Sequence, residues 1–122
     1  DVDAMARDMA EAGATIHRAP DDIPGVGRFA VMGDPQGAVI CLCRGEGSPP
    51  PSLPPMSPGT IGWHELFTDD PDAAFDFYAS RFGWEKMDAM DMGDMGVYQI
   101  IGKDGTMFGA MMRRPKEVPF CA

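Results

Sequence analysis

The sequence predicts an α+β fold built from two related modules, and three observations lead to this prediction. Short anchors recur at an offset of about 69 residues, as where residues 1–4 recur at residues 70–73. In each copy a helix-like segment precedes three strand-like segments. A stretch rich in proline and glycine, residues 45–59, separates the two copies. We therefore predict modules over residues 1–44 and 60–122, joined by a stiff linker.

The predicted helices cover residues 3–12 and 72–82. Apolar residues in each segment recur at intervals of three and four, which gives one apolar stripe along a helix. Asp70 and Pro71 suit the start of the second helix, and a glycine follows the end of each helix.

The predicted strands are short runs of β-branched, aromatic or Met residues between glycines and aspartates. In the first copy they cover 15–19, 28–32 and 38–43, and in the second 84–91, 97–101 and 106–112. One more strand, residues 61–68, precedes the second helix. Its counterpart would precede Asp1, so we expect two βαβββ modules, the first without its opening strand.

A single βαβββ module leaves one face of its sheet bare. Two paired modules solve this problem by forming a cupped mixed sheet with the helices outside and a cavity inside. The cavity is where we expect a small-molecule ligand. The pairing is expected within one chain or between two copies in a dimer.

The charge balance argues against two classes of partner. The formal net charge is −9, and Arg113, Arg114 and Lys116 form the one adjacent basic group, which we interpret as an exposed strand end. Nucleic acids and anionic membranes attract clustered Lys and Arg. We therefore expect neither as a partner.

The cysteines Cys41, Cys43 and Cys121 are odd in number, and their spacing matches neither a disulfide framework nor a zinc knuckle. We interpret them as buried, reduced thiols. The sequence has no apolar run as long as a membrane span and no signal-peptide pattern, so we expect a cytoplasmic protein.

Several motifs resemble the glyoxalase / bleomycin-resistance / extradiol-dioxygenase superfamily, also called vicinal oxygen chelate (VOC) proteins. Residues 63–70 (WHELFTDD), with Phe77-Tyr78 and residues 82–84 (FGW), resemble the opening of its N-terminal module. Residues 25–30 (GVGRFA) and 34–38 (DPQGA) resemble the end of its C-terminal module. The resemblance covers nearly all of the chain except the linker, and it implies the paired-module fold.

The order of the modules is reversed relative to one domain of that superfamily. A tandem protein, of which this chain holds the second half of one domain and the first half of the next, is the simplest explanation. A permuted domain is the alternative.

The resemblance also implies where a divalent metal would bind in members that have one. The ligand positions are occupied here by Trp63, Cys41 and Gly109, and the fourth lies on the missing strand. These residues offer no hard oxygen ligand, and only the Cys41 thiolate suits a softer metal. We therefore expect no metal or other cofactor. If the register were shifted by one residue, His64 would face the cavity, and His17 could be a further donor; we interpret both histidines as structural.

The predicted ligand face follows from alternation along residues 61–68. Trp63, Glu65 and Phe67 share the cavity face, while His64, Leu66 and Thr68 face the helix. Tyr98 and Arg28 are expected to contribute from neighbouring strands.

The sequence supports two functions. In the first, Trp63, Phe67, Tyr98 and Arg28 bind a small, partly apolar ligand without a metal, and Glu65 serves as a general acid or base if the protein is an enzyme. The aromatic side chains could instead fill space, with Glu65 paired to Arg28. In the second, the resemblance implies a metal-dependent lyase or isomerase of the lactoylglutathione lyase type, or a related dioxygenase activity.

Overall fold

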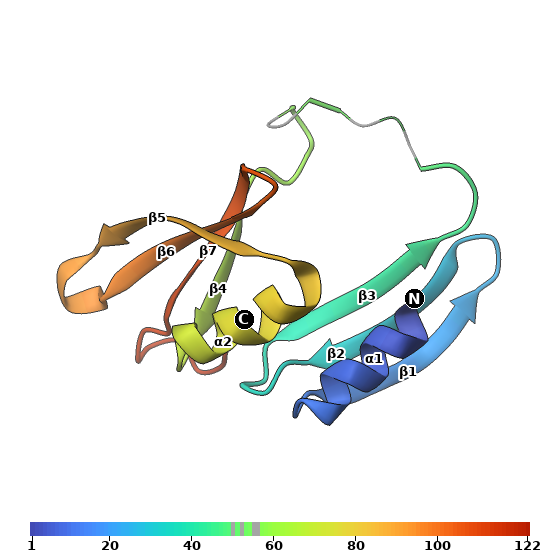
Figure 1. Cartoon of the computed structure of the whole chain (residues 1–122), viewed down its shortest axis with the longest axis horizontal. Coiled ribbons are helices and arrows are strands. Elements are labelled where there is room, and N and C mark those ends of the chain that lie inside the picture. Colours follow the sequence, from blue (N-terminus) through green and yellow to red (C-terminus); the bar gives the residue numbers. More distant parts are fainter. Residues whose placement is uncertain (50, 52, 55–56) are drawn as a thin grey trace. The chain divides into compact units, whose positions relative to one another are not determined.

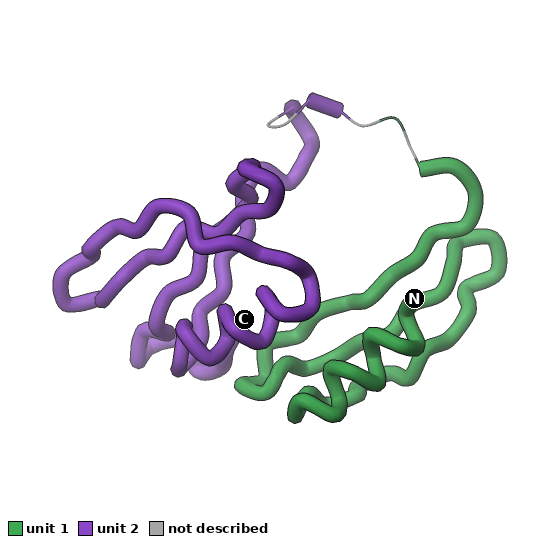
Figure 2. Tube along the Cα trace, in the orientation of Figure 1, with its two compact units in different colours: residues 1–52 green, residues 53–122 purple. Residues whose placement is uncertain are grey.

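The computed structural model describes residues 1–49, 51, 53–54 and 57–122. The chain divides into two compact units, Asp1–Ser52 and Leu53–Ala122, called unit 1 and unit 2 below (Figure 2). The predicted linker includes residues 50, 52, 55 and 56, which lie outside the described residues. The predicted module boundaries at residues 44 and 60 stay a prediction.

Unit 1 consists of one helix and three antiparallel strands (Figure 1). Their order along the chain is α1 (Val2–Glu11), β1 (Thr15–Ile23), β2 (Gly27–Gly33) and β3 (Val39–Gly45), and β2 lies in the middle of the described sheet. Asp1 caps the start of helix α1, and its carboxylate accepts a hydrogen bond of 2.9 Å from the backbone N–H of Ala4.

The core of unit 1 lies between α1 and one face of its sheet, since α1 contacts all three strands. Its buried residues come from the apolar stripe of the helix and from alternate strand positions: Val2, Ala6, Met9, Ala30, Met32 and Leu42.

The two cysteines of β3 correct one expectation. Cys41 and Cys43 are exposed, and only Cys121 is buried among the three. Arg28 on β2 binds Asp3 of α1 and so faces the helix. Phe29 and Val31 alternate with it and face away, and the register pairs them with Cys43 and Cys41. The two thiols therefore lie on the sheet face away from α1, where the helix of unit 1 does not cover them.

Unit 2 has the βαβββ order expected for a complete module. Its elements are β4 (His64–Thr68), α2 (Pro71–Phe82), β5 (Glu85–Asp91), a short 3-10 helix (Gly93–Met95), β6 (Val97–Lys103) and β7 (Thr106–Arg113). The described strands form a mixed sheet in the order β4-β7-β6-β5, in which β4 runs parallel to β7 and the other pairs are antiparallel. The α+β fold class is thus confirmed, whereas pairing of modules stays a prediction.

Helix α2 packs against one face of this sheet, where it contacts β4 and β7. Asp70 caps its start by accepting a hydrogen bond of 3.1 Å from the N–H of Ala73, and Gly83 ends it in the left-handed conformation at φ 67°. An aromatic cluster fills the space beneath the helix: Phe77, Tyr78, Phe82, Trp84 and Phe108.

Strands β1 and β4 differ by three or more residues from their predicted bounds, and the other strands by one or two. Strand β1 continues past Pro20 to Ile23, because it lies at the edge of the described sheet, where a residue without an N–H is tolerated. Strand β4 starts at His64 instead of residue 61, since its pairing with β7 begins at Gly109, beside an irregularity in the β6–β7 register.

In the described part of the chain, no helix is long and apolar enough to cross a membrane.

Candidate functional site

Three of the five predicted site residues meet on one face of the unit 2 sheet. The indole N–H of Trp63 donates a hydrogen bond of 2.7 Å to the hydroxyl oxygen of Tyr98. The Tyr98 hydroxyl in turn donates a hydrogen bond of 2.6 Å to Oε1 of Glu65. Trp63, Tyr98 and Glu65 therefore form one hydrogen-bonded chain, called the Tyr98 cluster below.

The sheet register explains how Tyr98 reaches Glu65. Glu65 on β4 pairs with Ala110 on β7, and Ala110 pairs with Ile100 on β6. Tyr98 is two residues from Ile100 and so lies on the same face. Strands two positions apart are separated by about 9.6 Å. Tyr98 and Glu65 lie diagonally across β7, and their long side chains meet over it beside Ala110, whose small side chain leaves room for them.

The Tyr98 cluster lies on the face opposite α2. Lys86 pairs with Ile101, and its ammonium group binds Asp72 of α2 at 2.7 Å. Strand positions that share a face with Ile101 therefore face the helix, and Tyr98 and Glu65 face away from it. This agrees with the alternation that the sequence predicts for β4.

The environment raises the pKa of Tyr98 above its usual value of 10.0. Burial, which disfavours the charged phenolate, is the largest cause, and the hydrogen bond to Glu65 adds to it because that bond requires the phenolic proton. The hydrogen bond from Trp63 acts in the opposite direction. Tyr98 is therefore a neutral hydroxyl at physiological pH.

The cluster is open to solvent. Trp63 is 40% exposed and Glu65 is exposed, while Tyr98 is half-buried. Two hollows on the surface of unit 2 meet at Arg113, one beside the start of α2 and one beside residues 114–117, and neither is lined by a residue of the cluster. The candidate site is thus an open sheet face within unit 2.

Phe67, the fourth predicted residue, lies on β4 two residues after Glu65 and is half-buried. Alternation places it on the same face as Glu65. Its backbone exchanges two hydrogen bonds with Ala122, of 2.8 Å from the Phe67 N–H and 3.1 Å from the Ala122 N–H.

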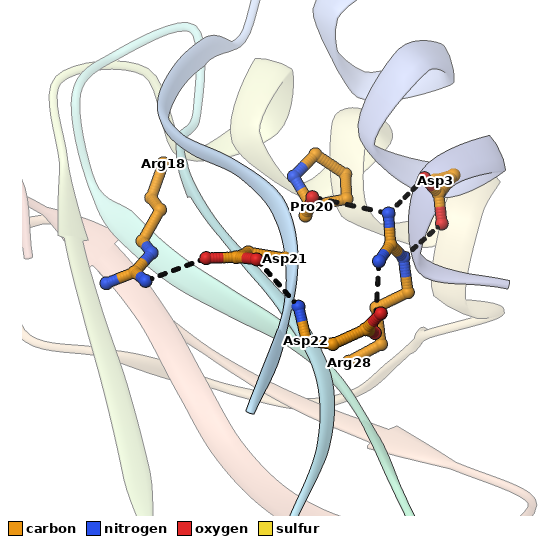
Figure 3. A network of polar contacts seen from close by, with 6 residues as sticks. All are labelled: Asp3, Arg18, Pro20, Asp21, Asp22 and Arg28. Atoms are coloured by element: carbon orange, nitrogen blue, oxygen red, sulfur yellow. Dashed lines mark hydrogen bonds and ion pairs between the residues drawn. The ribbon is translucent and has the colours of Figure 1, made fainter. Parts of the chain in front are cut away.

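Arg28, the fifth predicted residue, lies on β2 of unit 1 and binds partners within that unit (Figure 3). Its guanidinium donates to both carboxylate oxygens of Asp3, at 2.6 and 2.8 Å, to Asp22 at 3.0 Å and to the Pro20 carbonyl at 3.2 Å. The hydrogen bond from Arg28 lowers the pKa of Asp3 below its usual range. These contacts join α1, β1 and β2, and a role of Arg28 in ligand binding stays a prediction.

The ligand positions implied for a metal are poorly suited to a hard divalent ion. The Trp63 indole has no free lone pair for a metal, and its N–H is bound to Tyr98. At Gly109, an added Cβ would lie 2.4 Å from the His64 carbonyl oxygen, which leaves no room for a side chain. In the residues that the structure covers, no three His, Cys, Asp or Glu side chains gather as a metal site.

Sequence reasoning missed Met90, which lies next to the cluster. Met90 on β5 pairs directly with Tyr98 on β6 and is 51% exposed. It therefore extends the face by a flexible apolar side chain. Only the register of the β5–β6 pair reveals this neighbour, because the two residues are separated by an irregular connection.

Relatives that are similar to parts of this chain include the following three. "Anthracycline biosynthesis protein DnrV" of Streptomyces peucetius is 38% identical over 86 residues, which are 68% of this chain and 30% of that protein. "Anthracycline biosynthesis protein DauV" of Streptomyces sp. (strain C5) is 37% identical over the same shares of both chains. "Putative glyoxylase CFP32" of Mycobacterium tuberculosis is 50% identical over 44 residues, 36% of this chain and 17% of that protein.

The chain is similar to a glyoxalase-like protein over part of its length. It spans about 30% of the length of the two anthracycline biosynthesis proteins. No family model matches the chain.

Proposed function

We propose that this chain is part of a VOC-superfamily protein that binds a small, partly apolar molecule without a metal. The Tyr98 cluster carries this proposal. Trp63 presents an exposed aromatic ring held in place by its hydrogen bond to Tyr98, and Glu65 presents a carboxylate beside it. A fixed aromatic surface with one oriented polar group is suited to a planar ligand.

The relatives named for anthracycline biosynthesis support an aromatic ligand, since anthracyclines contain a planar, fused ring system. A ring of this kind would stack on Trp63, with Phe67 and Met90 as apolar neighbours on the same face. If the protein is an enzyme, Glu65 is the group we expect to move a proton.

The fluorescence of Trp63 can report ligand binding, because the chain has two tryptophans and the other one can be replaced. In the Trp84→Phe variant, Trp63 is the remaining tryptophan, and we expect a neutral anthracycline aglycone to quench its fluorescence to saturation. The control is Trp63→Phe, in which Trp84 lies within the aromatic cluster under α2 and its fluorescence should not saturate. A linear, non-saturating response in both variants would contradict the proposal.

The similarity to a protein named as a glyoxylase supports the second candidate, a metal-dependent lyase or isomerase of the lactoylglutathione lyase type. Its test is metal content. Stoichiometric Ni, Zn or Mn in the purified full-length protein, removed together with activity by a chelator, would favour the lyase over metal-free binding. Ligand binding that persists unchanged in the presence of a chelator would favour the first candidate.

A further inference from the structure

The hydrogen bonds within the Tyr98 cluster use both of its side-chain donors. Trp63 has a single N–H, which is bound to Tyr98, so the indole offers a ligand its ring face alone. The single O–H of Tyr98 is directed at Oε1 of Glu65. The second carboxylate oxygen of Glu65, Oε2, has no hydrogen-bond partner among the described residues. The polar group left over is therefore an acceptor with a negative charge.

Among the described residues of unit 2, the face around the cluster adds no side-chain donor. The residues that the register and alternation place around the cluster are apolar: Phe67, Met90, Ile100, Ala110 and Met112. Five cations among the described residues of unit 2 bind partners outside the cluster, and two of them, Arg81 and Lys103, donate to the carbonyls of Phe77 and Phe82. Arg113 donates to the Asp69 carbonyl, Arg114 pairs with the Asp69 carboxylate, and Lys86 pairs with Asp72.

We propose that this face selects ligands that donate a hydrogen bond, above all planar aromatic cations, and rejects anions. This inference rests on the proposed function and names its ligand class. The aromatic ring lies on Trp63, and an ammonium or hydroxyl group of the ligand donates to Oε2 of Glu65. A cation gains a charge-assisted hydrogen bond, whereas a carboxylate placed there meets a like charge with no donor to bind it.

Tyr98 has a specific part in this selectivity, as a positioning residue. Its oxygen occupies the Trp63 N–H, which would otherwise be a free donor pointing to the ligand face. Its O–H also holds one oxygen of Glu65, which leaves the other directed at the ligand. Without the hydroxyl, the Trp63 N–H would be available to a ligand acceptor, and the preference against anions should weaken.

The test uses three probes with the same ring and different polar groups: 1-naphthylmethylamine as the cation, 1-naphthylmethanol as the neutral donor and 1-naphthoate as the anion. Binding to the full chain is followed by the NMR shift of the Trp63 indole N–H. We expect the amine to bind best, the alcohol less well and the naphthoate weakest. The Kd for naphthoate should exceed the Kd for the amine by about tenfold or more, which corresponds to one charge-assisted hydrogen bond.

Three variants separate the contributions. Glu65→Gln keeps the size of the side chain and removes its charge. It should reduce the preference for the amine over naphthoate to less than about threefold. Tyr98→Phe should raise the affinity for naphthoate. The control Asp76→Asn removes the same charge from an exposed position on α2, away from the face, and should leave the preference unchanged.

The outcomes distinguish the two proposals. If none of the three probes shifts the Trp63 resonance, the proposed binding function is overturned. If the probes bind with equal affinity, or naphthoate binds best, the function stands and the selectivity inference is wrong. An equal loss of preference in Asp76→Asn and Glu65→Gln would assign the effect to the overall negative charge and would also overturn the inference.

Discussion

At the scale of residues, Tyr98 is the central group of the candidate site. It accepts one hydrogen bond and donates another, and both partners lie at β4 or just before it. Because Trp63 precedes the regular part of β4, the bond to Tyr98 is a contact that fixes the indole where strand pairing does not. The orientation of the aromatic surface therefore depends on one hydroxyl group.

The pKa of Tyr98 gives a direct check on this geometry. We expect Tyr98 to ionise above its usual value of 10.0 and Glu65→Gln to lower its pKa, because a carboxylate stabilises the protonated phenol. The lowering should be partial, since burial, the largest cause, remains in the variant. NMR of tyrosine labelled at the Cζ carbon resolves Tyr98 from Tyr78. An unchanged pKa in Glu65→Gln would show that the Tyr98–Glu65 bond is absent in solution.

The ion pair of Arg28 with Asp3 should stabilise the fold to an extent that depends on pH. The folded-state pKa of Asp3 is lowered by Arg28, so this pair stabilises the fold fully above the usual Asp value of 3.8. The contribution is lost as the pH falls through the lowered pKa. We expect Arg28→Met to lower the melting temperature at pH 7 and the difference from the unmodified chain to shrink below about pH 3.8.

The neighbouring Arg44 provides a matched control. It lies opposite Arg28 on β3, and like charges in this arrangement repel. Arg44→Met removes the same charge and should leave the melting temperature unchanged or slightly higher. A loss of stability in Arg44→Met equal to that in Arg28→Met would contradict the assigned role of the Asp3 pair.

Some of these residue-scale features follow from the sequence and some do not. Alternation along one strand places Trp63 and Glu65 together because it depends only on neighbours in the chain. The bond of Tyr98 to both depends on the order β4-β7-β6 and on the small residue between, which no local pattern contains. The exposure of Cys41 was missed for a related reason: an apolar strand has two faces, and α1 covers one.

At the scale of elements, the pairing of β4 with β7 determines where the site lies. Gly109 lies close against β4, because a Cβ added to it would be 2.4 Å from the carbonyl oxygen of its partner His64. A side chain there would push β4 away from β7. The placement of Glu65, the next residue of β4, depends on the same contact.

We therefore expect Gly109→Ala to destabilise unit 2 by about 1–3 kcal/mol, the usual range for overpacking. Urea denaturation measures the loss, and the Trp63 indole N–H resonance reports whether the Tyr98 cluster persists. Gly45→Ala is the control, since its added Cβ would approach no atom closer than 3.8 Å. Equal stability of the two variants would mean that β4 can shift at no cost.

The helices were predictable at this scale because their signals are local. Asp70, Pro71 and Gly83 bound α2 within one residue of its predicted limits. The start of β4 was not predictable in this way, because it lies where pairing with Gly109 of β7 begins, a partner distant in the sequence.

At the scale of the whole molecule, the structure divides the chain into two units, and their sequence repeat predicts that the modules pair within one chain or between two copies. Small-angle scattering with analytical ultracentrifugation tests this prediction. We expect a compact particle, either a monomer or a dimer. Loosely packed, extended monomers would contradict the pairing.

The contact of Ala122 with β4 has a consequence for solubility. Strand β4 lies at the edge of its described sheet, and the reciprocal hydrogen bonds with Ala122 occupy the outward N–H and C=O of Phe67. Exposed edges of this kind are templates on which further chains add as strands and aggregate. By occupying both outward groups of Phe67, Ala122 shortens the part of this edge on which a further strand could add.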